Sequence, residues 1–546
     1  MKKLIPSRIG RVALSLAGFF MGCALAGSFL NHKVTAQQEA PDEASMRDSL
    51  RQFANVYSLV EQNYAEPITT DKADKLVYDG AIPGMLQVLD PHSSFHDPRD
   101  FAQMREDQAG KYYGVGMSIQ PQPDPTAKNG LKIVVLTPFE GAPSYKAGIH
   151  PGDVIVNVDG KSTAGMDSVA VASLLKGARN THVSVTMMRE GSQKPLVFDL
   201  VREEVSRPSV DLAFMIRPGI GYIHVTNFME TTGKEVADAL DRFGNIHGLL
   251  IDLRGNPGGM VLQAVAMTDQ FLQRGQVVVT QKGRAFPDEV FRATHGSNGS
   301  HYPIVVLVGR NTASAAEIVS GALQDHDRAL IVGETTFGKG LVQSVFELPE
   351  HTGLVLTTYH YFTPSGRLIQ RNYNHVSLYD YYYVRNDAKA PGKNNTEVKL
   401  TDSGRTVYGG GGITPDEKIA PIKPNDFQDS LYRNYVFFNF AKHYLATRTI
   451  TKTFQVDDGV MDTFKEFLKS QNINYTDADI ANIHDWITSN IKSELFTSEF
   501  GQSEGLQVRA DADPEISKAL EFLPEAQALE ERALLAQHQQ MASASR

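Results

Sequence analysis

The chain has 546 residues, which is too long for one hydrophobic core, so we expect roughly three or four domains. A composition of 41% hydrophobic and 21% charged residues is typical of a globular protein. The formal net charge of −10 argues against a nucleic-acid-binding protein, because such proteins need a basic surface.

The first segment has the layout of a secretory signal. Basic residues precede an apolar run at residues 12–30, and a small-residue site ends at Ala36. Cleavage after Ala36 is the preferred prediction, with an earlier site at Ala26. The run is also long enough to remain as a membrane anchor, and Cys23 offers a lipoprotein site as a further alternative.

Cleavage after Ala36 would remove five basic residues and no acidic residue, so the formal charge would become −15. It would also remove Cys23, the only cysteine in the chain. A chain without cysteine has no disulfide, no cysteine nucleophile and no cysteine-ligated zinc site.

The rest of the chain changes its pattern several times. Apolar residues at three- and four-residue spacings predict helices between residues 46 and 104. Short strand-like runs between residues 116 and 201 predict a small β-rich domain with one helix at 167–176. After Arg207, buried apolar strands alternate with helices, which predicts an α/β core.

Two further segments follow the core pattern. Residues 371–412 are polar and tyrosine-rich, and we expect them to form a long exposed insertion. Beyond Asp426 the pattern is helical again. The expected parts are a signal peptide or uncleaved anchor, an N-terminal helical segment, a β-rich domain, a core with its insertion, and a helical C-terminal extension: 1–36, 37–105, 106–205, 206–425 and 426–546.

Ser314 is the first candidate for chemistry. It lies where an apolar strand at residues 302–308 turns into a helix at residues 314–324. The hydroxyl is exposed at such a turn, and the first backbone N–H groups of the helix are unpaired at the positive end of its dipole. Those donors suit an oxyanion, so Ser314 is a candidate nucleophile and the amide of Ala315 a candidate donor. The alternative is that Ser314 only caps the helix.

Lys339 follows 25 positions later, after another buried strand and between Gly338 and Gly340. The glycines let its backbone approach a site closely, and burial would favour the neutral amine that a general base needs. Gln343, on the next strand, can hold this lysine through a hydrogen bond. The alternatives are a solvated loop lysine and an ordinary strand glutamine.

The glycine-rich turn at residues 254–259 also follows a buried strand, and its amides near Gly258 can supply a second oxyanion donor. It has neither the lysine nor the spacing of a phosphate-binding loop. Taken together, Ser314, Lys339 and this turn predict a serine hydrolase of the Ser/Lys type.

Other arrangements fit the sequence less well. His92 and His96 have a metal-like spacing, but no HExxH glutamate lies between them. Asp325 and His326 follow the serine helix too closely to fold back as a triad. We therefore expect no metal and no cofactor.

In combination, the motifs of residues 46–419 resemble those of the C-terminal processing peptidases, also called tail-specific proteases. The motifs, in chain order, are LDPHSSFHDP, YYGVGM, AGIHPGDVI, DLRGNPGG, NTASAAEI, GETTFGKGLVQ, YFTPSGRLIQ and GITPD. The resemblance implies a multidomain α/β and β fold: an α/β serine-peptidase core of the crotonase/ClpP-like kind, an inserted PDZ-like domain, and helical N- and C-terminal segments.

The resemblance also implies roles for individual residues. Ser314 would be the nucleophile, Lys339 the general base and Gln343 its orienting partner. The amides of Ala315 and of the Gly258 region would form the oxyanion hole. Asp325 matches a family aspartate with a supporting role at most.

The β-rich middle domain resembles a PDZ domain, in which a loop binds the terminal carboxylate of a peptide and the peptide adds as a strand. In this chain the loop residues implied as substrate-binding are Gly114, Val115, Gly116 and Met117. The insertion at 371–412 and the extension after Asp426 match no motif of the family.

From these residues and the resemblance we expect an exported serine endopeptidase that binds C-terminal tails through its PDZ domain and cuts near them with a Ser/Lys dyad. Its partners would be proteins or peptides with accessible C-termini, with a regulatory adaptor and an oligomer left open. We expect no nucleic-acid partner and a membrane contact only through the N-terminal segment. The expected location is the bacterial periplasm or cell envelope, with anchoring to the inner membrane as an alternative.

Two rivals share these residues. One is a non-catalytic PDZ adaptor whose protease core is only a scaffold. The other is a protease that rests inactive until a partner or a movement of the PDZ domain activates it.

Overall fold

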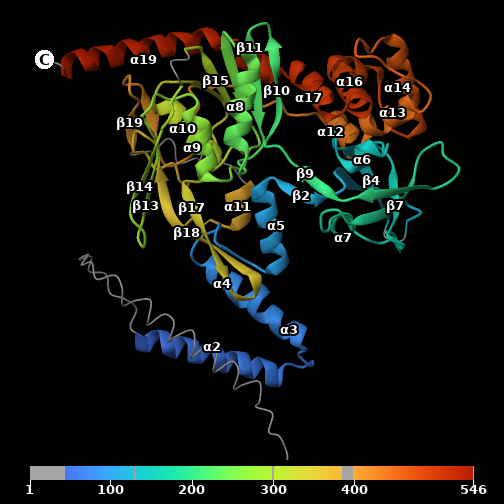
Figure 1. Ribbon diagram of the computed structural model, residues 1–546, viewed down its shortest axis with the longest axis horizontal. Coiled ribbons are helices and arrows are strands. Elements are labelled where there is room, and N and C mark those ends of the chain that lie inside the picture. Colours follow the sequence, from blue (N-terminus) through green and yellow to red (C-terminus); the bar gives the residue numbers. More distant parts are fainter. Residues whose placement is uncertain (1–42, 128–129, 298–300, 375, 384–396, 545–546) are drawn as a thin grey trace, which may run out of the picture. The chain divides into compact units, whose positions relative to one another are not determined.

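A computed structural model describes residues 43–544 except 128–129, 298–300, 375 and 384–396 (Figure 1). The predicted signal peptide and anchor lie outside the described residues. Among the helices that are described, none is both long and apolar enough to cross a bilayer. The chain divides into two compact units, Met1–Gly80 and Ala81–Arg546.

The described part of the first unit, from Glu43 on, consists mainly of helices, as the sequence predicts for residues 46 onward. They are α2 (Glu43–Asn63), α3 (Thr70–Lys75) and the start of the π-helical turn η1 (Leu76–Ala81). The Thr69 hydroxyl caps α3 by accepting a hydrogen bond from the amide of Lys72. Along α2 the apolar side chains recur at helical spacing and are exposed: Met46, Leu50, Phe53, Val56 and Val60.

The second unit begins with α4 (Ile82–Gln87), β1 (Ser94–His96) and α5 (Pro98–Ala109). The Asp97 carboxylate caps α5 by accepting from the amide of Asp100, and Pro98 occupies the first helical position. Gly110 ends the helix with φ +67°.

A β-rich domain follows, as the sequence predicts. Its sheet has the order β3-β4-β5-β7-β8, with β6 beside β5, while β2 pairs with β9. Alternate residues of β7 are fully buried, which gives this sheet one core-facing side. The elements are β2 (Lys111–Gly114), β3 (Met117–Pro123), β4 (Leu131–Pro138), α6 (Pro143–Lys146), β5 (Val154–Val158), β6 (Lys161–Ser162), α7 (Ser168–Leu175), β7 (His182–Met188), β8 (Leu196–Val201) and β9 (Glu203–Ser206).

The α/β core contains a six-stranded sheet of order β10-β11-β12-β15-β16-β21. All neighbours are parallel except β10 and β11. Every residue of β12 and β15 is buried, as expected for strands covered on both faces. The elements are β10 (Val210–Arg217), β11 (Ile220–Val225), α8 (Thr232–Phe243), β12 (Gly248–Asp252), α9 (Val261–Asp269), β15 (Ile304–Val308), α10 (Ala315–Asp325), β16 (Leu330–Gly333) and β21 (Glu417–Lys418).

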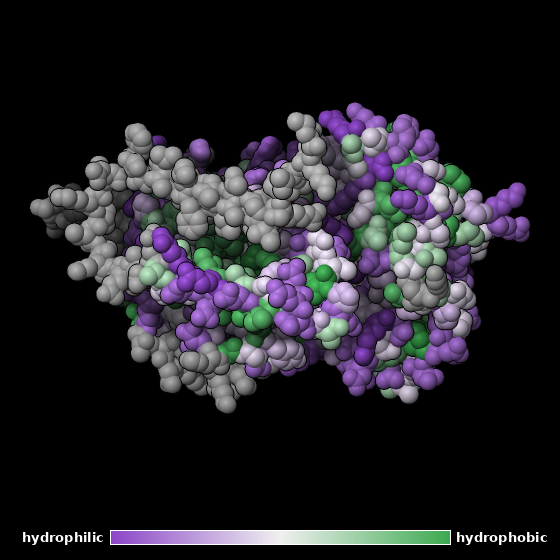
Figure 2. All heavy atoms as spheres, turned by 90° about the horizontal axis from the view of Figure 1, so that it is seen from below, coloured by the Kyte–Doolittle hydropathy of each residue, from purple (hydrophilic) through white to green (hydrophobic). Residues whose placement is uncertain are grey.

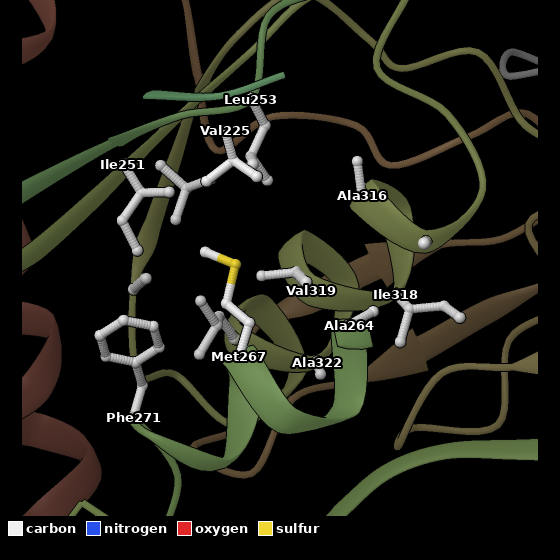
Figure 3. Packing of buried hydrophobic residues seen from close by; sticks show 14 of the residues in the cluster. Val225, Ile251, Leu253, Ala264, Met267, Phe271, Ala316, Ile318, Val319 and Ala322 are labelled. Carbon is white, nitrogen blue, oxygen red and sulfur yellow. The ribbon is translucent and has the colours of Figure 1, made fainter. Parts of the chain in front are cut away.

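One face of this sheet packs against α8, α9 and α10. Figure 3 shows Met267 of α9 between Val319 of α10 and Ile251 of β12. Ala316, Val319 and Ala322 fix α10 in this core because all three side chains are fully buried. The candidate nucleophile therefore precedes a rigidly packed helix.

A second sheet lies beside the core and has the strand order β1-β18-β13-β14. The strand β17 also pairs with β18, on the edge opposite to β1. Its strands are β13 (Val277–Gly283), β14 (Glu289–Arg292), β17 (Leu341–Leu348) and β18 (Thr352–Phe362), and the 3-10 turn η2 (Pro349–His351) joins the last two. The strand β1, more than 240 residues before β17 in the chain, thus belongs to the same sheet.

Most of the described residues of the segment at 371–412 are exposed or partly exposed, and a few are buried. It contains α11 (Leu378–Tyr383), β19 (Val398–Leu400) and β20 (Thr406–Tyr408). Tyr381 and Val407 are buried. The polar composition conceals these contacts because tyrosine can bury its ring while its hydroxyl finds a partner.

The helical C-terminal extension separates into two parts. The first five helices have their own aromatic-rich core: α12 (Asp426–Arg433), α13 (Val436–Leu445), α14 (Asp458–Ser470), α15 (Asp477–Asn482) and α16 (His484–Phe500). The last three instead cover the second face of the six-stranded sheet: α17 (Gln502–Asp511), α18 (Pro514–Leu520) and α19 (Leu523–Ala544). Over the face in Figure 2, apolar and hydrophilic residues are intermixed, as is usual for a globular surface.

Candidate active site

Ser314 lies at the sharp turn between β15 and α10, with φ +54° and ψ −116°. A positive φ is uncommon for a residue other than glycine and stores local strain. The turn is held by Thr312, whose hydroxyl donates to the carbonyl of Leu253 at 2.7 Å and accepts from the amide of Gly309 at 2.9 Å. The amide of Ala313 donates to the carbonyl of Asn256 at 2.9 Å. The serine turn and the glycine-rich turn are therefore joined through their backbones.

Gly258 lies directly against the candidate nucleophile. Its φ is +99°, and a Cβ atom placed on it would lie 2.6 Å from Cβ of Ser314 and 2.9 Å from the amide nitrogen of Ala315. The amide of Gly258 itself donates to Oδ1 of Asn256 at 2.8 Å. Among the described residues, the amides of Ala315 and Gly259 have no hydrogen-bond partner. The site thus brings two donor peptides, one from each turn, beside Ser314.

Glu317 is a functional candidate that the sequence reasoning missed. Its buried carboxylate accepts from the amides of Ser314 at 2.8 Å, Lys339 at 2.9 Å and Gly338 at 2.7 Å, and from the hydroxyl of Thr336. Burial raises the pKa of Glu317, while these four donors act in the opposite direction. A glutamate three residues after a serine at a helix start is a capping-box spacing, and that signal could have identified it.

Lys339 begins the turn into β17, and its side chain is mostly buried. Burial lowers the pKa of Lys339, while the nearby carboxylates of Asp90 and Glu317 oppose that shift. The neighbouring glycines allow close packing: the amide of Gly340 donates to Oε1 of Gln370 at 2.8 Å. The one carboxylate of Glu317 therefore holds the backbones of both Ser314 and Lys339, although no hydrogen bond joins Ser314 Oγ to Lys339 Nζ among the described residues.

Gln343 lies on β17 opposite Thr357 of β18. Its Nε2 donates to Oγ1 of Thr357 at 3.1 Å rather than bonding to Lys339. Tyr361, also on β18, donates its hydroxyl to the carbonyl of Ser314 at 3.1 Å. The strand β18 thus supplies two further groups that sequence spacing could not identify, because they come from pairing between strands.

A cover of aromatic groups surrounds the loop that carries Lys339. The Arg371 guanidinium lies 4.4 Å from the ring centre of Phe337 and 4.5 Å from that of Tyr381. The Tyr381 hydroxyl lies 3.1 Å from Nε2 of His92. These contacts surround Phe337, two residues before Lys339, in the loop whose lysine has a pKa lowered by burial.

The histidine and aspartate alternatives are engaged elsewhere. His96 Nε2 lies 2.9 Å from the hydroxyl of Ser94, whereas His92 faces Tyr381. Asp325 forms a buried ion pair with Arg367. His326 lies 2.7 Å from the carboxylate of Asp402. Asp325 and His326 therefore have partners other than Ser314.

The four predicted substrate-binding residues lie in the β-rich domain, at the junction of β2 and β3: Gly114, Val115, Gly116 and Met117. The carbonyl of Val115 accepts from the amide of Ser144 at 2.9 Å, and the carbonyl of Gly116 accepts from Phe139 at 2.9 Å. Gly116 has φ +74° and contacts Ala142 too closely to carry a side chain. In the described part of the chain, the amides of Val115 and Gly116 have no partner although both residues are buried.

Comparison with known families gives four matches along the chain. Residues 219–376 match the description "Peptidase family S41", and residues 134–189 match a PDZ domain. Residues 427–479 match the C-terminal helical domain of a probable PDZ-protease. Residues 12–99 match the N-terminal domain of the activating protease CtpB.

Curated proteins are similar over most of their own length. The carboxy-terminal-processing protease of Bartonella bacilliformis is 35% identical over 353 residues, which cover 63% of this chain and 79% of that protein. The carboxy-terminal processing protease CtpA of Bacillus subtilis is 33% identical over 344 residues, 62% of this chain and 70% of that protein. The solved structure of a photosystem II D1 C-terminal processing protease is 32% identical in sequence. The match covers 59% of this chain and 90% of that protein, with a TM-score of 0.31.

Proposed function

This chain belongs to the carboxy-terminal-processing proteases, a family of serine-type peptidases, and on that premise we propose that it cuts protein substrates near their C-termini with a Ser314–Lys339 dyad. The observation that carries the proposal is the Glu317 carboxylate, which binds the backbones of both residues at 2.8 Å and 2.9 Å. One buried group therefore fixes the nucleophile turn and the lysine loop together.

In the proposed reaction, Oγ of Ser314 attacks the scissile carbonyl carbon and its proton passes to the neutral amine of Lys339. The tetrahedral intermediate collapses, the C–N bond breaks, and Lys339 returns the proton to the leaving nitrogen. Water then attacks the ester on Ser314, again with Lys339 as base, and releases a carboxylate. The lowered pKa of Lys339 supports this role because a larger fraction of its amine is neutral near pH 7.

The oxyanion would be bound by the amide of Ala315 and by the glycine-rich turn. The amide of Gly258, the predicted donor, is directed to Asn256, whereas the next amide, of Gly259, lacks a partner in the described structure. We therefore assign the second donor to the peptide between Gly258 and Gly259. Each such donor is worth about 2.7–4 kcal/mol of transition-state stabilisation.

The PDZ domain would bind the tail of the substrate. The unpartnered buried amides of Val115 and Gly116 suit a carboxylate, since buried N–H groups are nearly always paired. The other two predicted loop residues, Gly114 and Met117, flank Val115 and Gly116. A peptide bound there would pair with β3 beside α7.

The parts of the chain are proposed to follow the boundaries given by the sequence, with a PDZ domain at 106–205 and a peptidase core at 206–425. Export to the periplasm or cell envelope is also proposed, and it rests on the signal-like residues 1–36. Its partners would then be exported proteins with accessible C-termini.

The rival in which the protease rests inactive has one observation in its favour. No hydrogen bond joins Ser314 Oγ to Lys339 Nζ among the described residues. That rival expects weak cleavage by the purified protein and strong cleavage after PDZ deletion or addition of a partner.

The test is cleavage of an unstructured protein by the purified enzyme and by Ser314→Ala and Lys339→Ala. Both variants are expected to fold, as judged by circular dichroism and thermal unfolding, and to lose activity by about 10⁴-fold or more. Retained activity in a folded Lys339→Ala protein would exclude the dyad. The non-catalytic adaptor predicts no cleavage by the wild type under any condition.

A further inference from the structure

The loop that precedes β1 contains two buried polar residues that take no part in the proposed reaction. They are Asp90 and Ser93 of the LDPHSSF sequence, and each is less than a tenth exposed. Asp90 Oδ1 accepts from the amides of His92 at 2.7 Å and Ser93 at 2.8 Å, and its Oδ2 accepts from the Ser93 hydroxyl at 2.7 Å. A buried carboxylate costs free energy even with such partners, so its position needs an explanation.

The Ser93 hydroxyl connects this loop to the strand that holds Gln343. Its Oγ accepts from the amide of Thr357 at 3.1 Å, and Oγ1 of Thr357 accepts from Nε2 of Gln343 at 3.1 Å. The registers agree with this connection, because Gln343 is opposite Thr357 in the β17–β18 pair and Ser94 is opposite Val355 in the β1–β18 pair. The chain of contacts runs from Asp90 through Ser93 and Thr357 to Gln343.

Asp90 also acts on Lys339 through its charge. Of the two carboxylates that oppose the lowering of the lysine pKa, Asp90 has the larger effect and Glu317 the smaller. Lys339 in turn acts on His92. Burial, and next the charge of Lys339, lower the pKa of His92 to about 4, so this ring is neutral at pH 7 and adds no charge.

We propose that Asp90 and Ser93 are positioning residues of the catalytic site: Asp90 fixes the Ser93 hydroxyl, and Ser93 fixes Gln343 through Thr357. The proposal rests on the Ser314–Lys339 function described above and adds to it a segment more than 220 residues before Ser314 in the chain. The loop before β1 thus adds two residues to the site formed by the peptidase core.

The role of Asp90 is tested with Asp90→Asn. The asparagine keeps one acceptor oxygen for the two amides but has no second oxygen to accept from the Ser93 hydroxyl. The Ser93 hydroxyl is then no longer fixed, so kcat is expected to fall about tenfold with KM unchanged. A kcat equal to that of the wild type would overturn this role.

The matched control is Asp97→Asn, seven positions along the chain. It removes the same charge from the exposed cap of α5, where the carboxylate accepts from the amide of Asp100. Its kcat is expected to equal that of the wild type. If Asp90→Asn does not fold, Ser93→Ala tests the same chain of contacts.

The positioning role is tested with Ser93→Ala and Ser93→Thr. Ser93→Ala removes the acceptor of the Thr357 amide, so kcat is expected to fall about tenfold with KM unchanged. Ser93→Thr keeps the hydroxyl and is expected to recover most of kcat. Equal kcat values for Ser93→Ala and the wild type would overturn this role.

The outcomes separate this proposal from the function on which it rests. An inactive Lys339→Ala together with wild-type kcat values in Asp90→Asn and Ser93→Ala would overturn the positioning roles and leave the dyad intact. An active, folded Lys339→Ala would remove the dyad itself, whatever the Asp90 and Ser93 variants show.

Discussion

Glu317 connects the backbones of Ser314 and Lys339 within the site. Its two oxygens accept four hydrogen bonds, from Ser314, Thr336, Gly338 and Lys339. A carboxylate can do this because it carries acceptors only, whereas an amide of the same size presents one oxygen and one donor group. The relative position of the Ser314 and Lys339 backbones therefore depends on the charge type at residue 317 and not only on its shape.

Glu317→Gln is accordingly expected to be strongly impaired. The amide nitrogen would face two donors, and each unsatisfied buried group costs about 1–3 kcal/mol. We expect at least a hundredfold loss of kcat/KM and a lower Tm, measured by peptide cleavage and thermal unfolding. Glu347→Gln, on an exposed position of β17, is the control and should change neither value.

The glycine-rich turn and the serine turn act as one element, because the Gly258 backbone fits against Ser314 and Ala315. Gly255 belongs to the same turn and also has a positive φ, +71°, but a Cβ atom on it would meet open space. Substituting each glycine in turn therefore separates the free-energy cost of strained backbone from the cost of a collision with Ser314.

We expect Gly255→Ala to cost only about 1–2 kcal/mol of stability from the left-handed backbone, with activity largely kept. Gly258→Ala adds a collision at 2.6 Å with Cβ of Ser314 and should reduce kcat/KM by at least about a hundredfold more. The two variants would be compared by kcat/KM and by urea unfolding, and equal activities would show that Gly258 does not set the position of Ser314.

The loop between β2 and β3 carries the second prediction at this scale. If the amides of Val115 and Gly116 bind a terminal carboxylate, a substrate with an amidated C-terminus loses that contact. We expect its kcat/KM to fall by about tenfold, the effect of one charge-assisted hydrogen bond. A free-acid and an amidated version of one peptide provide the measurement, and identical values would argue against tail recognition by this loop.

At the scale of the whole molecule, the chain end completes the peptidase core. Helices α18 and α19 bury Ile516, Ala526 and Leu529 against the sheet face opposite α10. The same region binds the turn next to the oxyanion site, since Arg254 pairs with Asp513 at 2.9 Å and with Glu515 at 3.0 Å. The C-terminal extension therefore contacts the turn that carries the candidate oxyanion donor, in addition to forming its own helical domain.

This contact gives a stability prediction. Leu529 is 1% exposed, so Leu529→Ala should cost about 2.7–5.0 kcal/mol in the free energy of unfolding. Leu535, six residues later on the same helix, is 64% exposed, and Leu535→Ala should change stability by less than about 0.5 kcal/mol. Denaturant unfolding of both variants is the measurement, and equal effects would mean that α19 does not cover the sheet in solution.

The sequence predicted the order of the parts, the two apolar strands that flank Ser314, and the glycines around Lys339, because these signals are local. It could not identify Glu317, Thr357 or Tyr361 as site residues, since their roles depend on which strands pair and which turns meet. Helical periodicity likewise shows that α19 has an apolar face but not which sheet that face covers. Tyr381 was missed for a related reason, because its burial arises from contacts with the distant His92 and Arg371.

The most direct test of the central claim is peptide mapping of the acyl-enzyme by mass spectrometry, after rapid acid quenching of the enzyme with a peptide ester substrate. The account predicts that the wild type carries the acyl group on Ser314 and that Ser314→Ala and Lys339→Ala carry none. An acyl group on any other residue, or acylation of Lys339→Ala at the wild-type rate, would contradict it.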